Sequence, residues 1–326
     1  MFHIHNGEST ANTLREFGFQ GEHIAFQEVL MAGPTPGGLS SDEWLDLRAR
    51  FLSDEYELKI EDCISDLLKQ EAALLRFFEH DETILWFEHD LFCQVNLIYL
   101  LDWFSKQSLE KTRLSLICVG EFPGVKDFRG LGQLTGGQLA SLFDGRHEVT
   151  AQELSLASRA WAAYCSADPE AIERLIREDT SALPFLASAL QLYLARFPSV
   201  RNGLGRIENK LLELISDGAT SFNSLFVRFV AAEPVYGLGD LQLRCELKRL
   251  AKGREPLINV TGVDRGTRFH EASLELTDTG RAVLAGKRDF IEVNGIDLWL
   301  GGAHVQDQRA LWRWDAQNAT LARRAS

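Results

Sequence analysis

The sequence has no hydrophobic run long enough to cross a membrane. Its most apolar stretch, residues 91–104, is interrupted by Gln94, Asn96 and Asp102 and is shorter than the roughly 20 apolar residues that a spanning helix needs. Residues 1–3 lead straight into a strand-like pattern, without the basic start or apolar core of a signal peptide. These absences predict a cytoplasmic protein without a membrane partner.

Cysteine is scarce, and no two cysteines form a C-x-x-C pair. Most of them lie in apolar patterns, so we expect reduced, mostly buried thiols rather than disulfides. Cys93 lies in the candidate site described below. The alternative for this residue is a reactive thiol rather than a buried, inert one. No set of cysteine and histidine spacings completes a tetrahedral zinc site, so no structural metal is predicted. The five cysteines are Cys63, Cys93, Cys118, Cys165 and Cys245.

The first part of the chain has few basic residues. Residues 1–196 carry 16 Lys and Arg against 31 Asp and Glu, a balance of -15, whereas residues 197–326 carry 18 against 16, a balance of +2. The two balances sum to the net charge of -13. The acidic part should repel nucleic acid, so any polyanion contact would have to come from the second part.

The composition is that of a folded protein with more than one domain. The chain has 326 residues, of which 45% are hydrophobic and 25% charged, which excludes a disordered or collagen-like protein. Residues 2–5, 83–87 and 114–119 are strand candidates, and the last two are continuous apolar runs typical of parallel strands covered on both faces. Residues 1–148 are therefore predicted to form a Rossmann-like α/β domain with a mainly parallel sheet.

The remainder of the chain is predicted to form two further parts. From Thr150, which makes a capping box with Glu153, the pattern turns helical, so residues 149–200 are interpreted as a helical connector packed on the sheet. Residues 201–326 begin with three helix candidates, and two β-like segments then flank a turn at residues 264–266. That order is typical of a winged-helix-like domain. The helix candidates are residues 206–216, 221–232 and 241–251.

The most informative motif is the run of residues 85–90, where an apolar segment ends in three ionisable side chains. Charge at the end of a buried strand is costly unless it is paired or used, so we predict that Glu88, His89 and Asp90 are catalytic. His89 suits a general base or metal ligand because imidazole titrates near neutrality. The alternatives are that Asp90 only caps the following helix and that His89 is a structural hydrogen-bonding group.

A second motif, residues 6–9, follows the first strand. Asn6 and Gly7 allow a tight turn, and the helix that follows offers free amide groups to a negatively charged ligand. Residues 6–9 lack the lysine of a P-loop and the spacing of a dinucleotide fingerprint, and Ser9 is not in a G-x-S-x-G elbow. Glu8 would disfavour a phosphate unless a cation lay between them. An ordinary capped turn explains the motif equally well.

Together these motifs predict a polar pocket at the strand ends. The function expected is hydrolysis or group transfer on a small polar, nucleotide-like ligand, with a divalent cation such as magnesium held by Glu8, Glu28 and Asp90 as an option. Two alternatives stay open: a ligand-responsive winged-helix DNA-binding regulator, and a non-enzymatic adaptor. The predicted ligand-binding residues are Asn6, Gly7, Glu8, Ser9, Glu28 and Gln94.

The third helix candidate of the last part carries a stripe of basic residues. Arg244, Lys248 and Lys252 recur at every fourth position, with Arg249 nearby, as on a recognition helix that contacts DNA phosphates. A solvated helix face explains the same stripe. Because this part is near neutral and the whole chain is acidic, we favour the solvated face over DNA binding.

The motifs also resemble a bacterial family, domain-of-unknown-function family eighteen-thirty-five. The resemblance rests on residues 3–9, residues 28–34 and residues 86–94, and short motifs near residues 197–204 and 294–302 extend it over nearly the whole chain. It implies an α/β N-terminal domain and supplies no activity, cofactor or substrate. The family usually has Asp where this chain has Glu8 and Glu28, and a His-Glu pair in place of Met31 and Ala32. If that pair takes part in chemistry, this member binds without turnover.

Overall fold

The computed structural model describes residues 1–109, 111–262, 272–306 and 312–323 and contains a central sheet of five strands. β2, β1, β4 and β5 are parallel, and the short β6 runs antiparallel to β5. The predicted mainly parallel sheet is therefore confirmed. In spatial order the strands are β2 (Glu22–Ala25), β1 (Phe2–His5), β4 (Glu82–Glu88), β5 (Arg113–Val119) and β6 (His147–Glu148).

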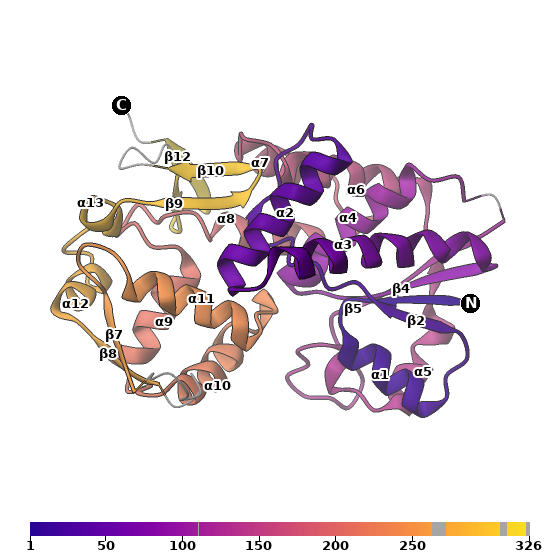
Figure 1. Cartoon of the computed structure of the whole chain (residues 1–326), viewed down its shortest axis with the longest axis horizontal. Coiled ribbons are helices and arrows are strands. Elements are labelled where there is room, and N and C mark those ends of the chain that lie inside the picture. Colours follow the sequence, from indigo (N-terminus) through magenta and orange to yellow (C-terminus); the bar gives the residue numbers. More distant parts are fainter. Residues whose placement is uncertain (110, 263–271, 307–311, 324–326) are drawn as a thin grey trace.

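Helices cover both faces of this sheet (Figure 1). α1 (Glu8–Phe17) and α5 (Gly136–Ser141) lie on one face, and α4 (Leu91–Ser105) and α6 (Ala151–Tyr164) on the other. α4 is buried around most of its circumference because it packs between the sheet and α6. The helices that follow the neighbouring strands β1 and β4 thus leave toward opposite faces. In α/β sheets, such a switch point is where ligands bind.

Several helix boundaries follow from capping residues in the sequence. The predicted capping box of Thr150 is present at the start of α6, and Ser40 forms a second capping box at the start of α2 (Ser41–Tyr56). α1 begins at Glu8, so Gly7 stands before its first turn and Ser9 lies within that turn. The next helix, α3 (Ile60–Leu74), is followed directly by a 3-10 turn, η1 (Leu75–Glu79).

The connector packs on α4 through α6 and α8. The next three helices lie where the sequence predicts them, and an antiparallel β7–β8 pair follows. This is the element order expected of a winged helix, and residues 264–266, the predicted turn, lie outside the described residues. The helices and strands of this region are α7 (Glu170–Ile176), α8 (Leu186–Leu194), α9 (Arg206–Ser216), α10 (Phe222–Ala232), η4 (Pro234–Tyr236), α11 (Asp240–Ala251), β7 (Ile258–Thr261), β8 (Ser273–Leu276), α12 (Asp278–Leu284) and α13 (Phe290–Asn294).

A second sheet joins the two ends of the chain. β3 (Gly33–Pro34) pairs in parallel with β9 (Asp297–Gly301), which pairs in turn with β10 (Ala303–Gln306). A separate antiparallel pair is formed by β11 (Trp312–Asp315) and β12 (Thr320–Arg323). The first and last parts of the sequence therefore share backbone hydrogen bonds.

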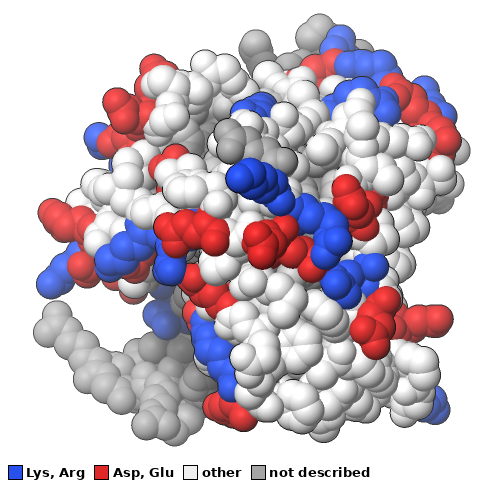
Figure 2. All heavy atoms as spheres, turned by 90° about the vertical axis from the view of Figure 1, so that its right-hand side faces the viewer, with Lys and Arg blue, Asp and Glu red and all other residues white. Residues whose placement is uncertain are grey.

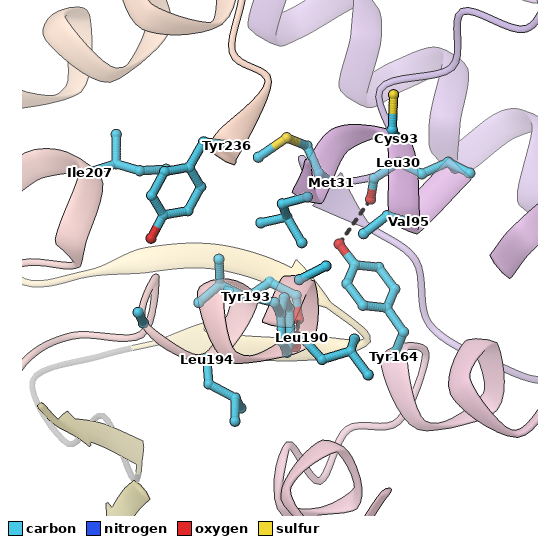
Figure 3. Close-up of a cluster of buried hydrophobic side chains, with 14 of the residues drawn as sticks. Leu30, Met31, Cys93, Val95, Tyr164, Leu190, Tyr193, Leu194, Ile207 and Tyr236 are labelled. Atoms are coloured by element: carbon cyan, nitrogen blue, oxygen red, sulfur yellow. Dashed lines mark hydrogen bonds between the residues drawn. The ribbon is translucent and has the colours of Figure 1, made fainter. Parts of the chain in front are cut away.

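The hydrophobic core is also continuous between the parts. Figure 3 shows Leu30 and Met31 beside Tyr164 of the connector and Tyr236 of the last part. The hydroxyl of buried Tyr164 donates to the carbonyl of Leu30. Hydrophobic burial of this kind holds the parts together as one body. Within the described ranges, no helix has the length and apolarity required to cross a bilayer.

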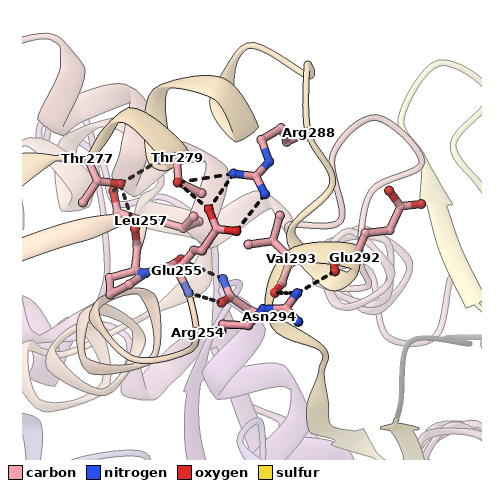
Figure 4. Close-up of polar contacts among 11 residues, drawn as sticks. Arg254, Glu255, Leu257, Thr277, Thr279, Arg288, Glu292, Val293 and Asn294 are labelled. Carbon is pink, nitrogen blue, oxygen red and sulfur yellow. Dashed lines mark hydrogen bonds and ion pairs between the residues drawn. The ribbon is translucent and has the colours of Figure 1, made fainter.

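Polar contacts hold the C-terminal elements in position relative to one another. The carboxylate of Glu255 binds both Arg288 and Thr279, while Asn294 bonds the backbone of Glu255 in both directions (Figure 4). Arg288 and Thr279 together hold the pKa of Glu255 at about 2. These contacts tie the segment after α11 to α12 and α13.

Candidate functional site

The two predicted motifs meet at one edge of the sheet. β1 and β4 are neighbours in register, with His5 opposite Trp86, so residues 6–9 and 88–90 leave the sheet side by side. The Asn6 amide donates to Cys93 Sγ at 2.7 Å and accepts from Asn96 at 2.9 Å. An added Cβ at Gly7 would meet nothing within 4 Å, so the space beside the start of α1 is open.

Glu88, Asp90 and Cys93 form a compact cluster at this edge. Their ligand atoms all lie within 4.8 Å of one another. Asp90 Oδ1 accepts from the Cys93 amide at 2.8 Å and caps α4. A helix cap is the alternative role that the sequence indicates for Asp90. Glu88 Oε1 accepts from the Leu131 amide at 2.7 Å. Gln94, predicted to bind a ligand, donates through Nε2 to the Glu88 carbonyl at 2.7 Å and so holds the strand end in place.

Burial controls the ionisation of this cluster. It raises the pKa of Asp90, and burial together with the charge of Asp90 raises the pKa of Glu88. Two carboxyl groups this close do not both ionise readily, so the pair holds a proton at higher pH than an exposed carboxyl does. Burial also raises the pKa of Cys93 well above its ordinary value. Cys93 therefore remains a neutral thiol, which is a poor nucleophile.

Asp90 differs from every other buried acid of the described residues. Each of the others has a basic side chain within ion-pair distance, whereas neither Asp90 nor its neighbour Glu88 has one in the part of the chain that the structure describes. The paired acids are Glu28 with Arg48, Glu82 with Arg113 and Arg146, Asp102 with Lys106, Glu153 with His147, Glu208 with Arg249, and Glu233 with Arg206.

His89 faces a different environment from its two neighbours. Its ring lies near the rings of Phe128 and Phe185, with centroids 6.3 and 6.0 Å away. Burial lowers its pKa, which the carbonyl of Val119 partly opposes, so the imidazole is neutral. Its Nδ1 is buried and has no hydrogen-bond partner among the described residues.

The other predicted ligand-binding residues have different partners. Glu28 is buried against Arg48, with a distance of 2.6 Å between Oε1 and Nη2, and it lines a separate hollow. Glu8 is exposed and pairs with Arg15 at 3.1 Å. The structure thus does not gather Glu8, Glu28 and Asp90 into the magnesium site that the sequence suggested. Ser9 is exposed beside Gly132, where an added Cβ would stand 3.5 Å from Ser9 Oγ.

A turn from the last part of the chain covers Asp90. Gly237 lies directly after η4 with φ of 65°, and an added Cβ there would stand 2.5 Å from Asp90 Oδ1. No local sequence pattern predicts this contact, because residues 90 and 237 are brought together only by the packing of η4 on α4.

Replacing Gly237 with alanine should therefore lower the free energy of unfolding by more than backbone strain alone, which costs about 1–3 kcal/mol for a residue of positive φ. Gly218→Ala is the matched control, because Gly218 has φ of 89° and an added Cβ there meets nothing within 4 Å. Urea denaturation of both variants measures the difference. Equal losses would show that the turn does not press on Asp90.

The basic residues of α11 are partly exposed and form ion pairs with acids of the same chain, while Lys252, just after the helix, is exposed. Lys248 pairs with Glu57, from the end of α2, at 2.6 Å, and Arg249 contacts Glu208 and Glu246. With Lys252, these basic residues line a cleft of about 930 Å³. Figure 2 shows another face of the molecule, at the right-hand side of Figure 1, where Lys and Arg are interspersed with Asp and Glu.

Comparison with protein-family models finds no match for this chain, and comparison with curated proteins finds none. The resemblance described above therefore stays an expectation.

Proposed function

We propose that the chain is an enzyme that binds a small polar ligand at the sheet edge and acts on it by proton transfer, in a hydrolysis or group-transfer reaction. The observation that carries the proposal is Asp90, a buried acid without a cationic partner among the described residues and next to a second acid of raised pKa. A protein that needed only a helix cap would do better with a neutral residue there.

The proposed chemistry requires that the carboxyl groups of Glu88 and Asp90 share one proton. In such a pair, the protonated member donates a proton and the ionised member accepts one. The open space at Gly7, where the amide groups of α1 begin, suits the negative or polar end of the ligand. Nucleotides and phosphosugars are the classes to test first.

The cluster also fits a divalent cation, which would supply the positive charge that Asp90 lacks. Glu88 and Asp90 would hold it through oxygen, with Cys93 Sγ in reach. Such an ion polarises a bound carbonyl or phosphoryl oxygen. The carboxyl oxygens and the amide of Asn6 would then position the ligand.

Glu88→Gln is expected to raise the free energy of unfolding by about 1–2 kcal/mol at pH 8, since a shift of one pKa unit corresponds to about 1.4 kcal/mol. Glutamine keeps the acceptor for the Leu131 amide and removes a charge that burial disfavours. Because the folded pKa of this carboxyl is raised, the gain is present at high pH and disappears as the pH falls below the ordinary value of 4.5. Urea denaturation at pH 8 and pH 4 measures it.

The same variant should lose ligand binding while gaining stability. Thermal-shift screening of nucleotides, phosphosugars and divalent ions compares wild type, Glu88→Gln and Asp90→Asn, which keeps the helix cap. Asp81→Asn, at an exposed position just before β4, is the control and should bind as wild type does. The proposal is wrong if no compound stabilises wild type more than the two site variants.

A further inference from the structure

A second hollow lies among α2, α3, α4 and α6, away from the carboxylate cluster. Its volume is about 530 Å³, and none of Glu88, His89 and Asp90 lines it. Trp44 of α2 reaches it because the Ser40 capping box fixes the start of that helix. Its aromatic lining residues are Phe26, Trp44, Tyr99, Trp103 and Trp161.

Three of these rings are arranged in two perpendicular orientations. Trp44 and Tyr99 are nearly parallel, at 8° with centroids 6.3 Å apart. Trp161 stands at 74° to Tyr99 and at 71° to Trp44, with centroids 5.1 and 6.1 Å away. All three side chains are partly exposed. Ring faces in two planes around a hollow attract a cation, because each face carries negative electrostatic potential.

The charged lining is predominantly acidic. Glu28, Glu71 and Asp102 line the hollow, against one basic residue, Lys106. Burial, and after it the charges of these three acids, raises the pKa of Tyr99, which keeps its phenol neutral. Arg48 and Lys106 offset the charges of Glu28 and Asp102, so Glu71 is the acid that adds net negative charge beside the rings.

Two of these acids are buried and incompletely partnered. Glu28 is 6% exposed, and both of its hydrogen bonds, from Arg48 and from the Val29 amide, fall on Oε1. Asp102 is also 6% exposed, and Lys106 binds its Oδ2. Within the described residues, Glu28 Oε2 and Asp102 Oδ1 have no hydrogen-bond partner. Neither oxygen is among the fully buried side-chain atoms that lack a partner, and both residues line the hollow, so these oxygens are accessible to a ligand held there.

We propose that this hollow binds an organic cation whose nitrogen carries methyl groups, such as a trimethylammonium head group. A methylated nitrogen has no N–H to satisfy and loses little hydration, so it fits walls made of ring faces better than a primary ammonium does. The carboxylates contribute attraction through charge without the need for hydrogen bonds. This site is independent of the carboxylate cluster at the sheet edge.

Isothermal titration of the full chain with choline tests the proposal against 3,3-dimethyl-1-butanol, a neutral molecule of the same shape. Choline should bind at least about tenfold more tightly, since a desolvated cation–π contact and an added charge attraction each reach that order. Equal affinity, or no binding of choline at millimolar concentrations, would overturn the proposal. A peptide containing trimethyl-lysine is the second arm, and tighter binding of that peptide would assign the head group to a methylated side chain.

Two variants distinguish binding of choline by the rings and acids of the hollow from unspecific binding. Trp161→Leu should weaken choline binding by about tenfold through loss of one ring face. Because that change removes a partly buried side chain, Glu71→Arg is the second variant: Glu71 is exposed on α3, so the fold tolerates it, and a cation there should repel choline. Glu61→Arg, at an exposed position of the same helix outside the hollow, should bind choline as wild type does. Unchanged affinity in Glu71→Arg would also overturn the proposal.

Discussion

Replacing Arg48 with methionine is expected to lower the free energy of unfolding by about 3–5 kcal/mol, because it leaves the Glu28 carboxylate buried without its cationic partner. Arg48 is fully buried within α2 and contacts Glu28 Oε1 at 2.6 Å. Its guanidinium also donates to the carbonyls of Val29, Ala32 and Pro34. Loss of Arg48 therefore leaves a charge and three backbone acceptors without their donor. Urea denaturation at pH 7 measures the change.

A neighbouring arginine provides the control. Arg50 lies on the same helix and pairs with Asp46, but its side chain is 64% exposed, so Arg50→Met should leave the free energy of unfolding close to that of wild type. In the double variant Glu28→Gln, Arg48→Met, the unpaired charge is absent, and part of the loss should be recovered. If Arg48→Met and Arg50→Met behave alike, the buried ion pair does not hold the segment of residues 28–34 in place.

The sequence could predict the elements whose signals are local. The apolar run of residues 83–87 and the cap at Thr150 depend on residues within one strand or one turn, so their elements appear where expected. The β3–β9 pairing was missed because β3 has only two residues and its partner is more than 260 positions away. A strand that short has no periodicity to detect.

The candidate site likewise contains residues that local sequence signals could place and residues that only packing brings together. Glu88 and Asp90 could be placed at a strand end because the apolar run that forms β4 stops at these ionisable residues. Cys93 joins them because Asp90 caps the helix and brings the first turn of α4 back over the strand end. Glu28 was expected at this site but is bound to Arg48, and no sequence signal identified Arg48 as buried. Long-range pairing of charges depends on packing, which the order of residues does not reveal.

The largest dependence of stability on pH is expected from three buried histidines next to Trp86. His3 Nδ1 accepts from the Trp86 indole at 3.1 Å, so its proton is on Nε2 and donates to the Gln20 carbonyl at 3.2 Å. His23 Nε2 lies 3.1 Å from the Phe19 carbonyl and is the donor there. His23 Nδ1 then accepts from His5 Nε2 at 3.0 Å. All three rings are therefore held in the neutral form.

The rings are also stacked on one another. The centroid of His23 lies 4.5 Å from that of His3 and 5.3 Å from that of His5. A proton added to His3 Nδ1 would break the bond from Trp86, and a second positive ring would repel the first. Burial, followed by the charge of His23, lowers the pKa of His3 from 6.5 to about 4, and burial lowers the pKa values of His5 and His23 as well.

His3 alone should remove about 3 kcal/mol of stability between pH 7 and pH 4, at about 1.4 kcal/mol per pKa unit. The unfolded chain binds this proton more tightly than the folded chain, so the stability is complete above pH 6.5 and is lost as the pH falls toward 4. Urea denaturation of wild type and His3→Gln across this range measures the effect. Glutamine does not titrate and offers both an acceptor and a donor, so its curve should fall by about 3 kcal/mol less.

The comparison of the two curves isolates His3 from other titrating groups. Glu88 and Asp90 have raised pKa values and so change stability in the opposite sense as the pH falls, but both proteins contain them and their contributions cancel in the difference. Any loss of packing in His3→Gln lowers its whole curve without changing its slope. Parallel curves for the two proteins would therefore mean that His3 accepts a proton in the folded state near its ordinary pKa, and that the stack beside Trp86 opens without cost.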